Sequence, residues 1–192
     1  MIFTWLHHNI LYDTVALYTN NLKPSTPAST LATGLAVCEG YAGLFATLGA
    51  KAGLETIVVG GHGKGLGYAQ PAPGSSLPPF DGNHAWNAVR IDNGEWKLID
   101  CCWGAGSVTG HGQPYNQSFT PAHFTRDNND FGISHFPSNS AHFFRTDGRA
   151  SISWAEYLLG TNNGDPGPQM FNGFTTEEGI AVESFLPAVR KL

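Results

Sequence analysis

The sequence predicts a domain of mixed helices and antiparallel strands, with helices near the N-terminus and a β-hairpin in the middle of the chain. Apolar residues recur at helical spacing in residues 3–20 and in the segment that begins at Cys38. The stretch from Asn83 to Gly106 carries tryptophans on both sides of the turn signal DNG at positions 92–94, which is typical of a hairpin. These three observations predict helices beside an antiparallel pair of strands.

The remaining elements follow from local signals. Gly53 is a plausible stop for the helix that begins at Cys38, and Thr175 with Glu178 has the spacing of a capping box. In chain order, we expect a helix over 3–20, a loop over 21–37, a helix over 38–53, a strand over 54–59, a glycine loop over 60–67, a loop over 71–82, the hairpin, an irregular segment over 107–150, a short helix over 151–159 and a last helix from 175.

The composition limits the possible functions. With 192 residues, 41% of them apolar, the chain is long enough for one domain with a sizeable core. The formal net charge is −5 and Lys and Arg do not cluster, so no nucleic-acid partner is expected. No apolar run reaches membrane-spanning length, so no membrane partner is expected. The first residues lack a signal-peptide pattern, which favours a cytoplasmic location, although the low Lys and high Gly, Asn and Ser content would also suit a secreted protein.

The three cysteines, Cys38, Cys101 and Cys102, do not form the pattern of a disulfide framework, because their number is odd and two are adjacent. Neighbouring residues on a strand point to opposite faces, so Cys101 and Cys102 would pair with each other only under strain. We therefore expect reduced thiols, as in an intracellular protein.

The hairpin turn allows two registers. A three-residue loop pairs Ile91 with Glu95, and that register makes His84 and Asp100 diagonal neighbours on one face, roughly 7–8 Å apart. A two-residue loop shifts the register by one residue and puts His84 and Asp100 on opposite faces. Turn preferences alone leave both registers open.

In the first register, one face of the hairpin carries a carboxylate among apolar side chains, namely His84, Trp86, Trp96, Leu98 and Asp100. A buried carboxylate needs a partner, and His84 is the nearest candidate for Asp100. A ring N–H donated to Asp100 fixes the tautomer of His84 and leaves its other nitrogen free to act as a base.

Cys38 is the candidate nucleophile that this pair would activate. It lies at the predicted start of a helix, where the dipole and the free N–H groups favour a thiolate. Each of the three residues also has an ordinary structural explanation. Cys38 could pack in the core, His84 could make a structural hydrogen bond from its strand, and Asp100 could cap the end of a strand. Their joint pattern, a Cys at a helix start followed by a His and an Asp on one face, favours a Cys-His-Asp triad.

Several longer motifs resemble one family. GLAVCEGYAGLFATLGAKAGL and NHAWNAVRIDNGEWKLIDCCWGAG resemble the transglutaminase-like core of papain-type enzymes, and most of all the kyphoscoliosis-peptidase group, which includes fungal cytokinesis proteins. The stretches WLHHNILYD, GHGKGLGY and FTRDNNDFGISHFPSN are similar to further segments of that group, the last of which ends in His-x-Pro. The resemblance covers about residues 1–145 and fades in SISWAEYLLG and SFLPAVRKL.

The resemblance implies an α+β, papain-like fold in which the Cys helix packs on an antiparallel sheet. It implies a catalytic core over 1–145 and a C-terminal extension over 146–192 that packs on it. It also implies Cys38 as nucleophile, His84 as base and Asp100 as the residue that orients the base. The sequence departs from the family in two places. At Cys101-Cys102 the family more often has a small residue followed by Thr. At residues 141–144 it usually has a Trp-Gln-Leu-like end. An upstream tryptophan assists the oxyanion in some relatives, but we expect Trp5 to be a core residue.

The expected function is thiol-dependent acyl transfer at an amide or peptide carbonyl, and the expected partner is a protein or peptide substrate. Trp86 and Trp96 are predicted to line a narrow apolar substrate channel. The sequence does not distinguish hydrolysis, deamidation and cross-linking, because the residues alone do not show whether water or an amine accepts the acyl group. The oligomeric state stays open as well.

Three alternatives share similar residues. Peptide N-glycanases carry Cys-x-x-Cys zinc pairs, which the sequence lacks. Arylamine acetyltransferases need a coenzyme A site and a different Cys segment. A catalytically silent binding or scaffold module is the main alternative, against which the intact triad argues.

No cofactor and no metal are expected. The glycine loop lacks the Gly-Lys-Ser/Thr of a phosphate-binding loop, and the histidines outside the triad lack ligand spacing. No acidic loop suits calcium.

Overall fold

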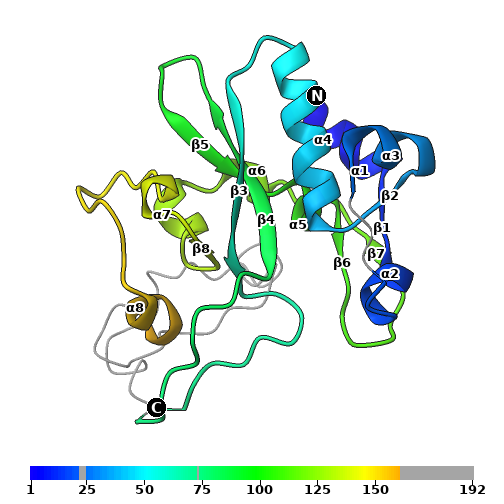
Figure 1. Ribbon diagram of the computed structural model, residues 1–192. Helices are drawn as coiled ribbons and strands as arrows, with labels where there is room; N and C mark the ends of the chain where they lie inside the picture. Colours follow the sequence, from blue (N-terminus) through cyan, green and yellow to red (C-terminus); the bar gives the residue numbers. More distant parts are fainter. Residues whose placement is uncertain (22–24, 73, 161–192) are drawn as a thin grey trace, which may run out of the picture. The chain divides into compact units, whose positions relative to one another are not determined.

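A computed structural model describes residues 1–21, 25–72 and 74–160 (Figure 1). They fall into two compact units, of which the first comprises Met1–Tyr68 and Phe80–Ser151. The second comprises, among the described residues, those at 69–72, 74–79 and 152–160. All three residues of the predicted triad lie in the first unit. The predicted boundary at residue 145 concerns an extension that lies largely outside the described residues, and it stays a prediction.

The first unit is built around an antiparallel sheet in the order β5-β4-β3-β8 (Figure 1). Two short pairs, β1 with β2 and β6 with β7, lie outside this sheet. The strands of the described chain are β1 (Leu11–Tyr12), β2 (Leu35–Ala36), β3 (Thr56–Gly63), β4 (His84–Arg90), β5 (Trp96–Ile99), β6 (Gly106–Ser107), β7 (Asn116–Gln117) and β8 (His135–Pro137).

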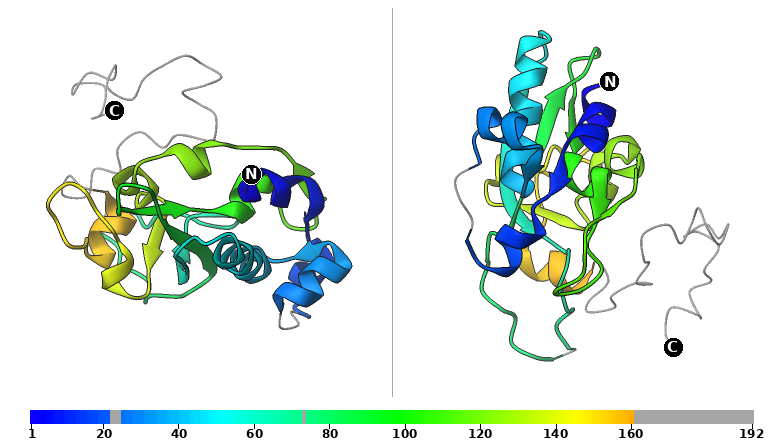
Figure 2. Two further views of the ribbon diagram at one scale, coloured as in Figure 1. Left: turned by 90° about the horizontal axis from the view of Figure 1, so that it is seen from above. Right: turned by 90° about the vertical axis from the view of Figure 1, so that its right-hand side faces the viewer.

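The longest described helix, α4, lies against strands β3 and β4 (Figures 1 and 2). The helices are α1 (Ile2–Asn9), α2 (Thr14–Tyr18), α3 (Pro27–Thr33), α4 (Cys38–Lys51), α5 (Cys101–Ala105), α6 (Ala122–Thr125), α7 (Asn128–Phe131) and α8 (Trp154–Leu159), with a 3-10 turn η1 (Ser140–His142). The predicted α+β core, with the Cys helix packed on an antiparallel sheet, is confirmed.

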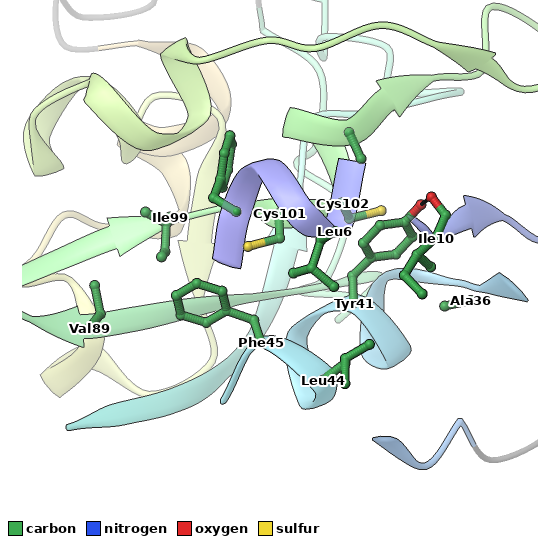
Figure 3. Packing of buried hydrophobic residues seen from close by; sticks show 12 residues of the cluster. Leu6, Ile10, Ala36, Tyr41, Leu44, Phe45, Val89, Ile99, Cys101 and Cys102 are labelled. Carbon is green, nitrogen blue, oxygen red and sulfur yellow. Dashed lines mark hydrogen bonds between the residues drawn. The ribbon is translucent and has the colours of Figure 1, made fainter. Parts of the chain in front are cut away.

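Buried side chains form two clusters. One joins Leu6 of α1 and Tyr41 and Phe45 of α4 to Val89 and Ile99 of the sheet (Figure 3). The other contains Trp86, Ala88 and Leu98 together with Phe131 of α7. Because alternate residues of β4 belong to different clusters, the sheet is covered on both faces.

The hairpin has the three-residue loop. Arg90 pairs with Trp96 and Asn87 with Ile99, which is the register that brings His84 and Asp100 to one face. The Ile91 N–H donates to Glu95 O at 2.9 Å, and Gly94 takes the left-handed conformation with φ of 83°. The strand β5 ends at Ile99, however, so Asp100 and the two cysteines after it leave the sheet and begin α5.

The predicted helix over 3–20 is wrong, because it is interrupted. Ile10 has an extended backbone, and Leu11–Tyr12 forms the strand β1, which runs parallel to β2. The predicted loop over 21–37 is also wrong in part, because it contains α3 and β2. Thr26 caps α3, Pro27 begins it, and Gly34 ends it with φ of 68°. Trp5 was expected in the core, but 40% of its surface is exposed.

Three later expectations can be compared with the structure. The glycine loop over 60–67 is wrong in its first half, because β3 continues to Gly63. The segment 107–150 is less irregular than predicted, since it contains β6, β7, β8, α6, α7 and η1. The short helix over 151–159 is confirmed by α8, whose first turn is capped by Ser153. The expected helix at Thr175 lies outside the described residues, and within those residues no helix is long and apolar enough to span a membrane.

Candidate active site

Cys38 is the first residue of α4, and the strand just before it fixes its position. Ala36 of β2 pairs with Tyr12, and the Asp13 N–H donates to Ala36 O at 2.9 Å. Gly40 lets the helix approach this strand, because a Cβ there would lie 2.6 Å from the Ala36 Cβ. The Cys38 side chain is half-buried.

Cys101 and Cys102 form the first turn of α5 and are buried, with 2% and 4% of their surfaces exposed (Figure 3). The expectation that they lie on a strand is wrong, but all three cysteines are free thiols. Burial raises the pKa of both Cys101 and Cys102 well above that of an ordinary thiol. Cys38 is therefore the cysteine that a reagent in solution can reach.

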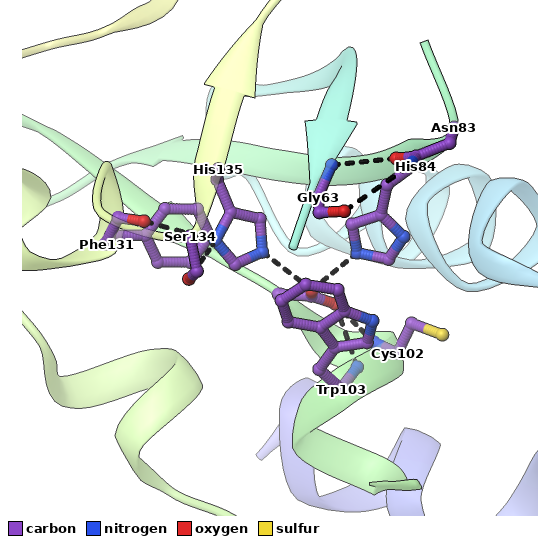
Figure 4. A network of polar contacts seen from close by, with 9 residues as sticks. Gly63, Asn83, His84, Cys102, Trp103, Phe131, Ser134 and His135 are labelled. Atoms are coloured by element: carbon purple, nitrogen blue, oxygen red, sulfur yellow. Dashed lines mark hydrogen bonds and ion pairs between the residues drawn. The ribbon is translucent and has the colours of Figure 1, made fainter. Parts of the chain in front are cut away.

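His84 opens the strand β4, and its ring is held in a fixed place. The preceding Asn83 bonds through its side chain to both backbone groups of Gly63 in β3 (Figure 4). The indole of Trp103 stacks on the imidazole, with ring centroids 4.5 Å apart and an interplanar angle of 21°. A Cβ at Gly63 would lie 3.0 Å from both the His84 and the Trp103 rings, so this part of β3 fits closely against the pair.

Asp100 is the N-cap of α5 and is completely buried. Its Oδ1 accepts the backbone N–H groups of Cys102 and Trp103, each at 2.9 Å. Its Oδ2 accepts from His84 Nε2 at 2.7 Å, and its own backbone N–H donates to His123 O at 3.0 Å. The predicted contact between His84 and Asp100 is therefore present in the structure.

His135 also binds this carboxylate, and sequence reasoning missed it. Its Nε2 lies 3.0 Å from Asp100 Oδ2, the oxygen that His84 also contacts (Figure 4). His135 is the first residue of β8, which pairs with β3. The only signal in the sequence was the His-x-Pro ending of FTRDNNDFGISHFPSN, which had no chemical role assigned to it.

The charges of the site are coupled. Burial lowers the pKa of His84, but the charge of Asp100 and hydrogen bonds with Asp100 and Cys38 outweigh it and raise this pKa to about 9. Burial raises the pKa of Asp100, but the charge of His84 and the hydrogen bonds from His135 and His84 hold it well below its usual range. His84 is therefore an imidazolium beside a carboxylate at neutral pH. Cys38 is close enough to contribute to the raised pKa of His84.

This coupling predicts a pH dependence of stability. Because the pKa of folded His84 is raised from 6.5 to about 9, its contribution to stability is complete below about pH 6.5 and is lost as the pH rises through 9. We expect the melting temperature of the wild type to fall over this interval by more than that of His84→Gln, which keeps an amide donor but does not titrate. Equal pH dependence of the two proteins, measured by calorimetry, would contradict the prediction.

The geometry also fixes which nitrogen of His84 can act as a base. A carboxylate accepts hydrogen bonds and does not donate them, so Nε2 of His84 carries its proton toward Asp100. Nδ1 is then the atom left for proton exchange with the Cys38 thiol. A half-buried thiol at a helix start, an imidazole and a buried carboxylate can together perform nucleophilic catalysis.

The two tryptophans of the hairpin occupy other places than predicted. Only 1% of the surface of Trp86 is exposed, and its ring packs edge-on against His135 with centroids 5.0 Å apart. Trp96 stacks on Phe144, with centroids 5.2 Å apart. Both rings pack in or against the buried cluster beside the sheet. This placement does not support the predicted substrate channel.

His84, Asp100 and His135 are also the cluster, within the described part of the chain, whose ligand atoms lie within 4.8 Å of one another and could hold a cation. Both contacts to Asp100 Oδ2 are at hydrogen-bond distances. A metal ion would have to displace the protons that make these bonds. The observed geometry is thus that of a hydrogen-bonded network.

Comparison with known proteins finds similarity to transglutaminase-like proteins. The model of the transglutaminase-like superfamily matches residues 1–101. Kyphoscoliosis peptidase from Mus musculus is 35% identical over 138 residues, which are 72% of this chain and 20% of that protein. The same protein from Homo sapiens gives the same identity and coverage.

Two further matches are more distant. The Lim and transglutaminase domain protein ltd-1 from Caenorhabditis elegans is 28% identical over 134 residues, which are 65% of this chain and 18% of that protein. A solved structure described as a TGase has a TM-score of 0.39 at 21% identity and covers 66% of this chain and 30% of its own. The chain thus spans about a fifth of the length of the curated relatives that it matches.

Proposed function

Because the chain belongs to the transglutaminase-like superfamily, we propose that it is a cysteine-dependent enzyme that transfers acyl groups from an amide or peptide carbonyl. The observation that supports this most is the 2.7 Å contact between His84 Nε2 and the buried Asp100 Oδ2. That contact leaves Nδ1 of His84 for Cys38, which contributes to the raised pKa of His84. A structural histidine and aspartate would not require a half-buried thiol beside them.

In the proposed reaction the Cys38 sulfur attacks the carbonyl carbon of an amide in a protein or peptide substrate. The carbonyl π electrons move to oxygen, and in this proposal N–H groups of the first turn of α4 stabilise the negative charge. The C–N bond then breaks, and the amine leaves with the proton that His84 Nδ1 carried. A thioester on Cys38 remains, and water or an amine attacks it to release the acyl group.

The first test is the reactivity of Cys38 toward iodoacetamide between pH 4 and 9, with the labelled cysteine mapped by mass spectrometry. We expect labelling of the native protein at Cys38 alone, because Cys101 and Cys102 are buried. We expect this labelling to be fast already at pH 6, because the His84 imidazolium favours the reactive form of the sulfur. In His84→Ala the labelling should become slow below pH 7.

Slow labelling that does not depend on His84 would instead favour a catalytically silent binding module. A reactive Cys38 leads to the second test, in which a glutamine-containing peptide is incubated with and without an amine. Amine incorporation indicates cross-linking, release of ammonia alone indicates deamidation, and chain cleavage indicates a peptidase. Activity that persists in Cys38→Ala would refute the proposed nucleophile.

A further inference from the structure

We propose that His135 is a positioning residue of this site: it donates from Nε2 to Asp100 Oδ2 and so holds the carboxylate in place against His84. The inference rests on the proposed function for its consequence, but the contact itself is independent of any substrate. His135 would act through Asp100 and would not touch the reacting atoms.

Asp100 needs hydrogen-bond donors on both of its carboxylate oxygens. The carboxylate is completely buried, and a buried charge is stable only when donors surround it. Oδ1 accepts hydrogen bonds from two backbone N–H groups, whereas Oδ2 accepts them from the side chains of His84 and His135. When His84 gives up its Nδ1 proton during the reaction, the positive charge beside Oδ2 disappears. The His135 donor remains at 3.0 Å throughout.

The imidazole of His135 is held in a fixed orientation. Its ring is 1% exposed and stacks on Phe131 with centroids 3.9 Å apart, while Trp103 lies 4.6 Å away on centroids. On its other edge, Nδ1 lies 3.0 Å from Ser134 Oγ, and because Nε2 carries the proton of the neutral ring, Nδ1 accepts from this hydroxyl. Both ring nitrogens are thus engaged, and the imidazole cannot turn without losing a polar contact.

The charge state of His135 follows from its surroundings. Burial lowers the pKa of His135 against the opposing influence of Asp100, and the nearby His84 lowers it further. The titratable groups around it are Asp100, His84 and His123, with ring centroids 5.7 Å away for His84 and 6.4 Å for His123. His135 is therefore a neutral donor beside the ion pair of Asp100 and His84. It orients the carboxylate without competing with His84 for the charge.

The test compares His135→Gln with His135→Leu, because glutamine places an amide N–H close to where Nε2 lies and leucine does not. His123→Leu is a matched control, since His123 is equally buried and its ring nitrogens have no hydrogen-bond partner within the described structure. We expect Cys38 alkylation at pH 6 to slow about 10- to 100-fold in His135→Leu and to stay within about 3-fold of wild type in His135→Gln. His123→Leu should label at the wild-type rate.

A second readout does not depend on the reactivity of Cys38. In a Cys38→Ala background, the His84 imidazole is titrated by NMR with each substitution at position 135. We expect the pKa of His84 to fall toward its ordinary value near 6.5 in the leucine variant, because Asp100 is no longer held against it, and to be retained with glutamine. A pKa that rises or stays unchanged in the leucine variant overturns the proposal.

Equal effects of leucine and glutamine would also overturn it, because they would indicate a packing role. Failure of the proposed function has a different signature. In that case wild-type Cys38 labels slowly and independently of His84, while the NMR titration still decides the role of His135.

Discussion

Asp100→Asn is expected to slow the alkylation of Cys38 at pH 6 by about 10²- to 10⁴-fold, where the upper end corresponds to the loss of kcat that the same change causes in a serine-protease triad. The reason lies in the donors that surround the carboxylate. Asp100 accepts four hydrogen bonds, two from backbone N–H groups and two from imidazoles. An asparagine side chain has one oxygen and one NH2 group, so its NH2 group must face either the two imidazole N–H groups or the two backbone N–H groups, none of which can accept a hydrogen bond.

Either orientation of the asparagine disturbs the site. If its NH2 group faces the imidazoles, His84 must move its proton from Nε2 to Nδ1 in order to accept, and Nδ1 is the atom that serves Cys38. If the NH2 group faces Cys102 and Trp103, two backbone donors of α5 are left unsatisfied and the start of the helix shifts. In both cases His84 also loses the charge that raises its pKa to about 9.

The control for this variant is Asp127→Asn. Asp127 also caps a short helix, accepting from the N–H groups of Asn129 and Asp130, but it is exposed and contacts neither His84 nor His135 in the described structure. Because asparagine is a good N-cap, Asp127→Asn should label at the wild-type rate. The measurement is the pH dependence of the alkylation rate for the three proteins, and wild-type rates in Asp100→Asn would show that the carboxylate does not orient His84.

The pair of His84 and Asp100 could be predicted because both residues depend on local rules. The turn at 92–94 limits the hairpin to two registers, and the one that the structure adopts puts these two side chains on one face. The helix start at Cys38 could be predicted for the same reason, since the helix that begins there has a clear apolar face. In each case the sequence pattern and the element that it predicts span about fifteen residues, a range in which turn and helix preferences are informative.

The remaining parts depend on pairing between distant segments. The helix predicted over 3–20 is broken because Leu11–Tyr12 pairs with residues 35–36, and apolar spacing alone does not reveal such a partner. His135 reaches Asp100 because β8 pairs with β3, which in turn pairs with β4. Trp86 shares a face with His84 but does not lie on an open surface, because Phe131 and His135 pack against its ring.

The same topology leads to the last prediction, Gly61→Ala, which is expected to weaken both the fold and the site. A Cβ at Gly61 would lie 2.2 Å from Phe136 O and 2.5 Å from the Trp86 ring. The first of these atoms belongs to the backbone of β8 and cannot rotate away, so β8 must move outward. We expect a loss of about 2–3 kcal/mol in the free energy of unfolding, or about 5–10 °C in melting temperature.

Since β8 carries His135, the displaced strand should also draw His135 away from Asp100 and slow the labelling of Cys38. Gly60→Ala is the matched control, because Gly60 is the adjacent residue of β3 and a Cβ there would project into open space. That variant should melt at or slightly above the wild-type temperature, as alanine reduces the entropy of the unfolded chain. If Gly61→Ala lowers stability but leaves labelling unchanged at a temperature where it is folded, the position of β8 does not control the triad.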